Sequence, residues 1–308
     1  MSRILVTGGA GYIGTSLVPR LLAEGHEVTV FDSLLHGGDA LMPFFADPRF
    51  GFVRGDVRDL RALADACAGA DRVVHLAAVV GFPACEADPR VAEEVNVGGS
   101  MNVIRAFRGP ILYASTVSVY GRQPGRVCDE GSEAAPLSAY GRTKLAAERA
   151  MLDHGAVAFR LATVFGVSGR MRFDLLINDL VFQAARNGYA VVYEPDAGRP
   201  FVHVRDVARL LARRPDPSMR GQAYNAGDEG LNTTKRKLCE AIALELPGAR
   251  FHFAEVGADK DQRDYELSFA KIKRAGFRTA VSIEDGIREL VRAEKAAQVR
   301  SPYSNVMP

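Results

Sequence analysis

The sequence contains no tryptophan and only four cysteines among its 308 residues. Cys67, Cys85, Cys128 and Cys239 lie far apart, with no C-x-x-C pair and no histidine at the spacing of metal ligands. This distribution argues against structural zinc and against a framework of disulfides. We therefore expect four small buried side chains in a reducing compartment, and no metal site.

An excess of charge of one sign and a long apolar run are also missing. Lysine and arginine total 39 and aspartate and glutamate 37, which leaves a net charge of +2. A balance this close to neutral gives no extended basic surface for nucleic acid or an anionic membrane. No apolar run approaches the roughly 18 residues of a membrane span, and the N-terminus does not resemble a signal peptide. We expect a cytoplasmic protein that binds neither nucleic acid nor membrane.

What the sequence does contain is an alternation of short apolar runs with helical patterns. Strands are predicted over residues 3–6, 28–31, 50–54, 72–77, 110–115 and 157–161, and helices over 11–24, 60–67, 91–107 and 140–152. Strands that are apolar throughout are typical of a parallel sheet covered by helices on both faces. The pattern predicts an α/β fold with a Rossmann-type doubly wound parallel sheet in residues 1–165.

The alternation loosens after about residue 163. We expect residues 166–198 to be insertions outside the regular core, followed by a strand over 200–204 and an extended segment over 247–255. Helices are predicted over 206–212, 232–246 and 283–297, and the tail from Arg300 is expected to be poorly ordered. Residues 166–308 would mainly form a second domain, with the stretch of about 199–230 returning to the first.

A glycine motif lies between the first predicted strand and helix. Gly8, Gly11 and Gly14 follow the spacing G-x-x-G-x-x-G, which lets a pyrophosphate approach the backbone closely at the positive end of a helix. Asp32 ends the second strand, where a carboxylate can accept both hydroxyl protons of an adenosine ribose and would repel a 2′-phosphate. Asp56 follows the third strand and could bind the adenine amino group. This arrangement predicts NAD rather than NADP.

Tyr140 and Lys144 are four residues apart within a predicted helix and therefore share one face. A lysine ammonium and an oxidised nicotinamide would stabilise the phenolate and lower the tyrosine pKa from about 10, so that it can act as an acid/base near neutral pH. The pair alone is common on ordinary helices. Here Ser115 and Thr116 also end a strand, at the sheet edge where open α/β sheets bind ligands.

These motifs resemble those of the extended short-chain dehydrogenases/reductases, a family of NAD-dependent nucleotide-sugar epimerases, dehydratases and decarboxylases. The matching segments are TGGAGYIG from Thr7, Asp32, GDV from Gly55, HLAA from His75, Asn96, STVSVYG from Ser115, YGRTK from Tyr140, RPFVHVRDVA from Arg199 and YNAG from Tyr224. They follow the family's order along nearly the whole chain. The resemblance implies a Rossmann domain that binds NAD, a smaller C-terminal domain that binds a nucleotide-diphosphate sugar, and a homodimer.

The resemblance also implies a role for individual residues. Tyr140 would be the acid/base, Lys144 would bind the nicotinamide ribose and Thr116 would hydrogen-bond the reacting oxygen, with Ser115 and Ser118 as supporting hydroxyls. Cofactor contacts are expected from Gly8, Gly11, Tyr12, Ile13, Gly14, Asp32, Ser33, Asp56, Val57, Leu76, Ala77, Ala78, Asn96, Tyr140, Lys144 and Val164. Substrate contacts are expected from Val80, Gly81, Thr116, Thr163, Arg172, Asn178, Arg199 and Arg263. His75 we interpret as a core histidine.

Two departures from the family pattern narrow the chemistry. In the 4,6-dehydratases the catalytic threonine is followed by Asp and Glu, whereas Val117 and Ser118 stand here. Because valine neither gives nor takes a proton, water elimination is disfavoured, and decarboxylation, which uses a Glu at the place of Ser118, is disfavoured less. We expect an NAD-dependent epimerase acting by transient oxidation at C4 of the sugar. An NDP-4-keto-sugar reductase or dehydrogenase stays open, and a non-catalytic NAD-sensing regulator is the remaining alternative.

Overall fold

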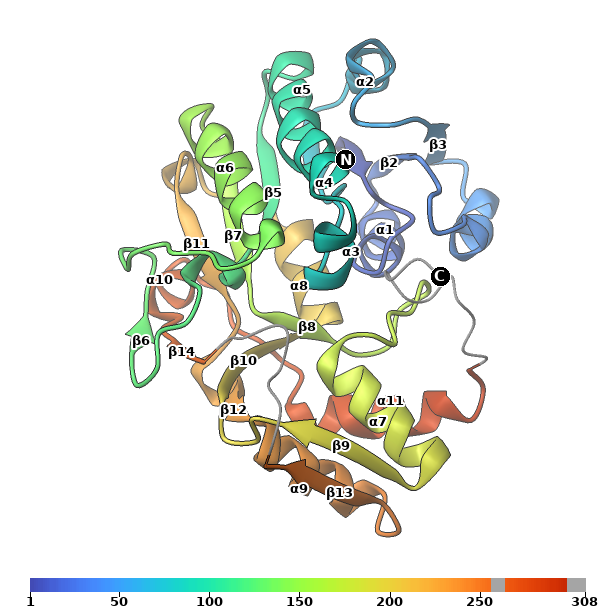
Figure 1. Cartoon of the computed structure of the whole chain (residues 1–308). Coiled ribbons are helices and arrows are strands. Elements are labelled where there is room, and N and C mark those ends of the chain that lie inside the picture. The colour runs from blue at the N-terminus through green and yellow to red at the C-terminus, as the bar shows by residue number, and fades with distance from the viewer. Residues whose placement is uncertain (256–263, 298–308) are drawn as a thin grey trace.

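The computed structural model describes residues 1–255 and 264–297 (Figure 1). The predicted tail from Arg300 lies outside these residues. Within them, a large sheet with helices on both faces forms the upper part of the view in Figure 1, and α7 (Leu176–Asn187), α9 (Lys235–Glu245) and α11 (Ile283–Glu294) lie in the lower part.

The large sheet has seven strands, and every neighbouring pair is parallel. In spatial order the strands are β3 (Phe50–Arg54), β2 (Glu27–Asp32), β1 (Arg3–Thr7), β4 (Arg72–His75), β5 (Ile111–Thr116), β7 (Val157–Leu161) and β11 (Ala223–Ala226). The chain first builds outward from β1 to β3 and then crosses back to place β4 against the other side of β1. The α/β fold class predicted from the sequence is confirmed, and the crevice at this reversal is where such sheets bind ligands.

Alternate side chains of β1 enter two different helical layers. Ile4 and Val6 pack in a core with α1 (Gly14–Ala23) and α8 (Val204–Ala212), whereas Leu5 packs in a core with α2 (Leu60–Cys67), α5 (Gly99–Ala106) and α6 (Ala139–Asp153). A strand buried on both faces needs apolar residues at every position. This explains why the three central residues of β1, Ile4, Leu5 and Val6, are all apolar.

The helix predicted over 91–107 is interrupted. The structure has α4 (Pro89–Glu93), a π-helical turn (Glu94–Gly98) and then α5. The turn directs Asn96 inward, where its Oδ1 accepts from the Val79 amide at 2.8 Å and its Nδ2 donates to the Val79 carbonyl and to Thr143 Oγ1, both at 3.0 Å. These bonds tie the loop after β4 to the helical layer.

A second, smaller group of elements surrounds its own apolar core. β8 (Thr163–Phe165), β10 (Gly198–His203) and β12 (Asn232–Thr234) form one sheet, and β9 (Tyr189–Tyr193) pairs in parallel with β13 (Arg250–Ala254). Side chains such as Phe165, Phe201 and Ile287 pack between these sheets and α7, α9 and α11. The shorter elements are α3 (Phe82–Ala87), α10 (Ala270–Arg274), β6 (Val127–Cys128) and β14 (Glu266–Leu267).

Two predictions for this region were wrong. Residues 166–198 are not mere insertions, because they form α7 and β9 and supply part of the second core. The helix predicted from Asn232 begins only at Lys235: residues 232–234 pair with β10, and the Thr234 hydroxyl accepts from the Lys237 amide as the helix cap. Hydrogen bonding to a neighbouring strand overrides local helical periodicity there.

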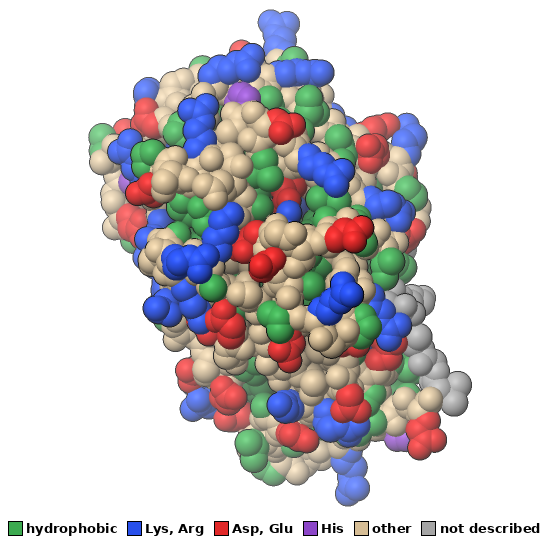
Figure 2. Space-filling model, turned by 90° about the vertical axis from the view of Figure 1, so that its left-hand side faces the viewer, with side chains coloured by type: hydrophobic (Ala, Val, Ile, Leu, Met, Phe, Trp, Pro, Cys, Tyr) green, Lys and Arg blue, Asp and Glu red, His purple; other side chains and the backbone are tan. Residues whose placement is uncertain are grey.

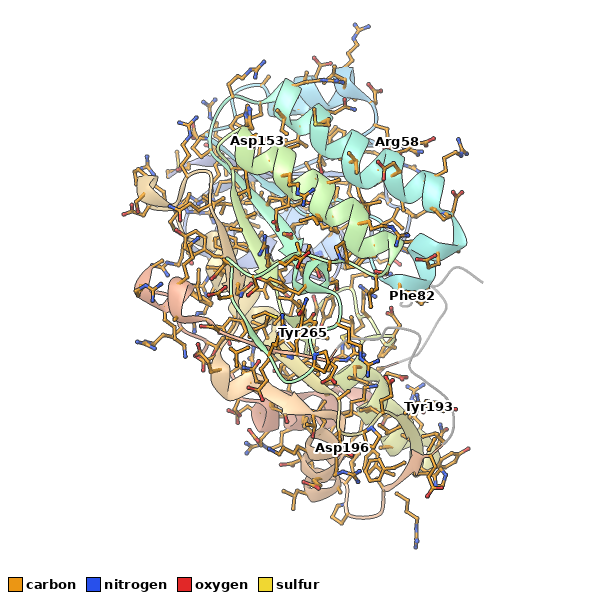
Figure 3. All side chains as sticks on the ribbon, turned by 60° about the vertical axis from the view of Figure 1, so that its left-hand side comes forward. Arg58, Phe82, Asp153, Tyr193, Asp196 and Tyr265 are labelled. Carbon is orange, nitrogen blue, oxygen red and sulfur yellow. The ribbon has the colours of Figure 1, made fainter. Side chains whose placement is uncertain are left out.

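The described surface carries mixed charge, and Figure 2 shows blue and red side chains interspersed over one face. None of the helices described here combines the length and apolar character needed to span a membrane. Tyr265, labelled in Figure 3, is buried and donates from its hydroxyl to the Val117 carbonyl at 2.9 Å, which connects residues after the 256–263 gap to the end of β5.

Candidate active site

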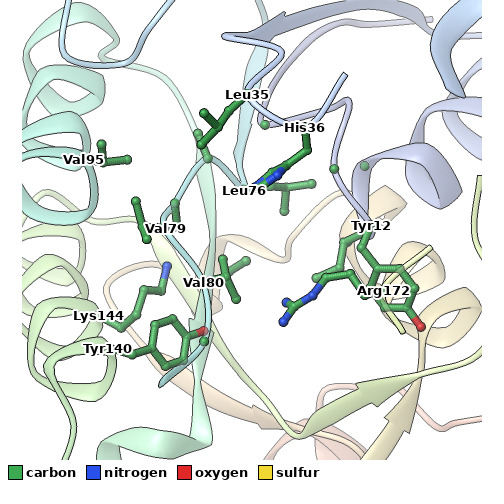
Figure 4. Close-up of a pocket in the computed structure, with 18 of the residues that line it drawn as sticks. Tyr12, Leu35, His36, Leu76, Val79, Val80, Val95, Tyr140, Lys144 and Arg172 are labelled. Atoms are coloured by element: carbon green, nitrogen blue, oxygen red, sulfur yellow. The ribbon is translucent and has the colours of Figure 1, made fainter. Parts of the chain in front are cut away.

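A cavity of about 460 Å³ opens at the carboxyl edge of the large sheet, a volume within the range of roughly 300–1,000 Å³ typical of small-molecule sites. Its walls come from the loop before α1, the ends of β2, β4 and β5, the start of α6, and the chain after β8. Figure 4 shows Tyr140 and Lys144 side by side on one wall and Arg172 near Tyr12 on the opposite wall. The cavity therefore lies between the glycine loop and the predicted catalytic pair.

The glycine loop can take no larger residue at its two ends. Gly8 has φ of +72°, and a Cβ on it would lie 2.6 Å from the Ala77 amide nitrogen. A Cβ on Gly14, where α1 begins, would lie 2.4 Å from the Gly9 carbonyl oxygen. This close packing holds the loop against the cavity, which it lines with Gly8, Ala10, Gly11, Tyr12, Ile13 and Gly14. A backbone held this way at a helix N-terminus fits the pyrophosphate of NAD.

Asp32 lies at the end of β2 and also lines the cavity. Its carboxylate accepts from the Ala10 amide at 3.0 Å and from the Leu34 amide at 2.8 Å. Burial raises its pKa, and the two amides act in the opposite direction. An oriented carboxylate beside the glycine loop is suited to hold the hydroxyls of an adenosine ribose.

Asp56 lines the same end of the cavity, next to Val57. Arg58 forms an ion pair with it at 2.7 Å, and these hydrogen bonds lower the pKa of the Asp56 carboxyl. Arg58 also reaches Glu94 on the π-helical turn at 3.2 Å. The Asp56 carboxylate is therefore held in place by contacts within the protein itself.

The predicted catalytic hydroxyls lie at the end of β5. Thr116 Oγ1 donates to Ser118 Oγ at 3.1 Å and accepts from the Ser118 amide at 3.1 Å, and both residues line the cavity. Tyr140 projects from the first turn of α6, where the Ser138 hydroxyl caps the helix by accepting from the Gly141 amide. Tyr140, Thr116 and Ser118 are thus brought to one end of the cavity.

Lys144 lies one helical turn after Tyr140 and is fully buried within the cavity wall. Its ammonium nitrogen is 4.1 Å from the centre of the Tyr113 ring. Burial lowers its pKa to about 7, although the negative charge of Glu148, four residues further along α6, acts in the opposite direction. The lysine is therefore poised to change its charge close to neutral pH.

Ser115 lines the cavity, but its hydroxyl is used by the protein. It donates to Glu148 at 2.5 Å, and Glu148 forms a buried ion pair with Arg160 at 2.7 Å. Arg160 in turn donates to the Tyr120 hydroxyl, which donates to Asn225. Ser115 thus joins a buried polar network behind the cavity, which differs from the predicted supporting hydroxyl beside a substrate.

The chain after β7 supplies the wall opposite α6. Thr163 and Val164 of β8 line the cavity, as does Arg172. The Arg172 guanidinium binds the carboxylate of Asp174 through Nε at 3.0 Å and through Nη2. It also reaches across to Gly81, where a Cβ would lie 3.5 Å from Arg172 Nη2.

Some of the other predicted contact residues line the cavity and some do not. The cavity lining includes Ser33, Leu76, Ala77, Ala78, Val80 and Gly81, together with all of the predicted glycine-loop residues. Asn96 is not in the lining, because its side chain is used by Val79 and Thr143. Arg199 is buried on β10 away from the lining, and Arg263 lies outside the described residues.

Asn178 is a correction to the predicted substrate contacts. It is fully buried on α7, where Oδ1 accepts from the Gly166 amide at 3.0 Å and Nδ2 donates to the Arg172 carbonyl at 2.9 Å and the Tyr12 hydroxyl at 3.3 Å. Its polar atoms hold the chain after β8 and do not face the cavity.

The interpretation of His75 as a core histidine is confirmed. Its side chain is buried, its ring nitrogens pair with Thr7 and Ser100, and burial lowers its pKa to about 3.

Sequence reasoning missed several residues that line the cavity, above all Arg170 and His36. Arg170 comes from the chain after β8 and His36 from the loop after β2. No local pattern connects these two segments, so only the tertiary structure brings them together. In the part of the chain that the structure describes, no cluster of three or more histidine, cysteine or acidic side chains could hold a metal ion.

Comparison with known proteins agrees with this geometry. The model of the NAD dependent epimerase/dehydratase family matches residues 4–227. The chain is 32% identical to a dTDP-glucose 4,6-dehydratase of Actinoplanes sp. over 94% of this chain and 96% of that protein, and 32% identical to a UDP-glucose 4-epimerase of Streptomyces lividans over 78% and 80%.

Among solved structures, the dTDP-glucose 4,6-dehydratase DesIV of Streptomyces venezuelae, crystallised with NAD, superposes with a TM-score of 0.84. The two chains are 32% identical, and the match covers 96% of this chain and 97% of that one. The family's cofactor is NAD, which fits the glycine loop and the oriented Asp32 carboxylate described above. The chain therefore belongs to the NAD-dependent epimerase/dehydratase family, whose members named here act on nucleotide-diphosphate sugars.

Proposed function

We propose that this protein is an NAD-dependent epimerase that inverts a nucleotide-diphosphate sugar by transient oxidation at C4. One observation carries the proposal. The acidic residues among the described cavity-lining residues are Asp32, which ends β2, and Asp56, which follows β3. Strands β1 and β4 separate β2 and β3 from β5, against which the helix of Tyr140 packs. Around Tyr140 the described residues of the cavity lining offer hydroxyls and the Lys144 amine, and none of them is a carboxylate that could promote elimination.

Tyr140 is placed to move the proton. Its phenolate would take the proton from the C4 hydroxyl of the sugar and return it at the end of the cycle. Lys144, within the same cavity wall, would stabilise that phenolate while its own amine carries charge. NAD, when bound, supplies the acceptor and donor of the hydride. Thr116, already bonded to Ser118, would orient the reacting oxygen.

Val117 supports reversible oxidation over dehydration. Its side chain is buried and apolar, and its carbonyl is held by the Tyr265 hydroxyl. A valine here can neither protonate a leaving hydroxyl nor remove a proton from the sugar ring. Ser118 follows with its hydroxyl bonded to Thr116. These two positions support the proposed chemistry, in which a proton and a hydride are transferred at one carbon.

The opposite wall and the relatives support the proposed substrate class. Arg172 lines the cavity with its guanidinium oriented by Asp174, and a fixed guanidinium suits an anionic diphosphate. The relative from Streptomyces lividans is named for an epimerase of UDP-glucose. We infer a nucleotide-diphosphate hexose or a close relative as the substrate, with Val80 and Gly81 beside the sugar.

The test is mass spectrometry of the purified protein incubated in heavy water with a panel of UDP-, dTDP-, GDP- and CDP-sugars and no added cofactor. The proposal expects a new isomer of unchanged mass without deuterium, because the hydride leaves and returns at the same carbon. Loss of water or carbon dioxide would overturn it. A product that forms only when an NDP-4-keto-sugar and NADH are supplied together would instead identify a 4-keto-sugar reductase, which would use the same Tyr140 and Lys144.

A further inference from the structure

The chain that leaves β8 does not continue directly into the second core. Residues 166–174, here called the return segment, turn back to the first turn of α1 before α7 begins. Gly166 makes the turn with φ of +110°, and a Cβ there would lie 2.2 Å from His203 Nε2, so no larger residue fits. The Tyr12 hydroxyl donates to the Gly166 carbonyl at 2.6 Å. The glycine loop and the return segment therefore touch directly.

Ser168 fastens the return segment to α1. Its hydroxyl donates to the Tyr12 carbonyl at 2.6 Å and lies 2.8 Å from Thr15 Oγ1 and 2.9 Å from Ser16 Oγ. The Arg170 amide donates to the same Thr15 hydroxyl at 3.0 Å. These bonds join two regions more than 150 residues apart in the sequence, next to the helix terminus that fits the pyrophosphate of NAD.

The return segment brings two arginines into the cavity wall. Arg170 and Arg172 line the same cavity as the glycine loop, although only 4% and 7% of their surface is exposed. Arg172 is bound by Asp174. Arg170 lies close enough to Asp32 and His36 for its positive charge to lower the pKa of both groups, against the effect of burial on Asp32.

His36 adds no positive charge here, because burial and the two arginines lower its pKa to about 4. The Arg170 guanidinium, a full cation, therefore supplies the positive charge in the part of the wall that it shares with Asp32 and the start of α1. The terminus of a helix supplies only about half an elementary charge, whereas the pyrophosphate of a dinucleotide carries two. Charge-assisted bonds from a guanidinium to phosphate are among the stronger hydrogen bonds.

We propose that Arg170 is a dinucleotide-binding residue that contacts the pyrophosphate from the side opposite the glycine loop, and that the return segment closes the dinucleotide site. NAD would then leave only when the bonds of Ser168 to α1 break. This consequence rests on the proposed function, because an epimerase that returns its hydride to the sugar gains from a cofactor that stays bound between turnovers.

The first experiment isolates the charge of Arg170. Dissociation constants for NAD, ADP-ribose and adenosine are measured by calorimetry on cofactor-stripped protein, for the wild type, Arg170→Met and Arg170→Lys. A lost charge-assisted bond worth about 1.5–3 kcal/mol corresponds to roughly a 10- to 100-fold weaker binding. Arg170→Met should therefore weaken NAD and ADP-ribose by about that factor and leave adenosine within about threefold, and Arg170→Lys should recover most of the loss.

The matched control is Arg90→Ala, since Arg90 is exposed on α4 and pairs only with Glu94 among the contacts described for it. It should leave all three dissociation constants unchanged. Unchanged binding of ADP-ribose by Arg170→Met would overturn the assignment. So would an equal weakening of adenosine, because adenosine has no pyrophosphate.

The second experiment tests closure. Ser168→Ala removes the hydroxyl bonds to Tyr12, Thr15 and Ser16 without changing charge, so NAD displaced by excess ADP-ribose should be released about ten times faster in stopped flow, with each neutral bond contributing about 1 kcal/mol. A wild-type release rate in a variant that unfolds at the wild-type temperature would overturn closure. If Arg170→Met weakens NAD binding and Ser168→Ala speeds NAD release but no sugar is isomerised, the proposed function fails while this inference stands. If a sugar is isomerised but the two variants bind and release NAD like the wild type, this inference fails while the proposed function stands.

Discussion

The cavity has two facing walls that are held in place by different forces. The catalytic wall, formed by the end of β5 and the start of α6, is backed by the buried ion pair of Glu148 and Arg160. The return segment forms the other wall and is fastened through the hydroxyl of Ser168. Breaking a buried ion pair costs several kcal/mol, whereas a neutral hydrogen bond contributes about 1 kcal/mol. From this difference we expect the proposed chemistry to take place on the more rigid wall and ligand exchange to take place at the other.

The largest expected effect is on the catalytic wall itself. Tyr140→Phe removes the hydroxyl that moves the proton and should lower kcat by about 1,000-fold or more, since acid/base catalysis contributes roughly 10²- to 10⁴-fold. The NAD dissociation constant should stay within about threefold. Turnover is measured with the sugar found active in the panel. Tyr189→Phe on the exposed face of β9 is the control, and full activity of Tyr140→Phe would refute the role of the tyrosine.

The next effect tests the support behind that wall. Glu148→Ala leaves Arg160 buried without its carboxylate and removes the acceptor of Ser115, so it should lower the free energy of unfolding by about 3–5 kcal/mol. Urea denaturation measures the change. Glu24→Ala, which breaks the exposed pair with Arg20, should cost under about 1 kcal/mol. Equal losses in the two variants would contradict the contrast between buried and exposed pairs.

We expect the buried Lys144 to lower the free energy of unfolding at neutral pH, although its proposed role beside Tyr140 requires it. Burial lowers its pKa from 10.5 to about 7, so between these pH values the unfolded chain binds more protons and stability rises with pH. Lys144→Met removes this dependence and should be more stable than the wild type by roughly 3 kcal/mol at pH 7, allowing for the lost contact with Tyr113. The difference should vanish near pH 10.5. Parallel curves from pH 7 to 10 would contradict the lowered pKa.

The smallest effect concerns the return segment. Asn178→Ala removes the bonds to Gly166, Arg172 and Tyr12 and should cost about 1–2 kcal/mol of unfolding free energy through the buried groups left unpaired. It should also speed NAD release, while kcat with saturating substrate changes little. Gln183→Ala, on the same helix and bonded to Asp179, is the control. A large drop in kcat without faster release would return Asn178 to the substrate contacts.

The same contrast explains how much could be predicted from the sequence. The strands of the large sheet follow from apolar runs, and the glycine loop, Asp32, Tyr140 and Lys144 follow from local spacing, because each depends on residues close in the chain. The partnership of Ser168 with Thr15 spans 153 positions, and no local rule predicts it. The apolar spacing of Leu176, Leu180 and Ala184 in α7 was present in the sequence, but it follows a basic, turn-rich stretch that concealed the start of the helix.

The π-helical turn at Glu94–Gly98 determines how the protein would respond to the deletion of one residue. Such a turn holds one residue more than an α-helical turn, so deleting one codon within 94–98 would restore an ordinary helix and leave α4 and α5 in nearly the same relative orientation. Asn96 would then lose its bonds to Val79 and Thr143. A one-codon deletion here would therefore free the loop after β4 from the helical layer while keeping the helices themselves, so the length of this segment matters for the cavity wall and not for helix formation.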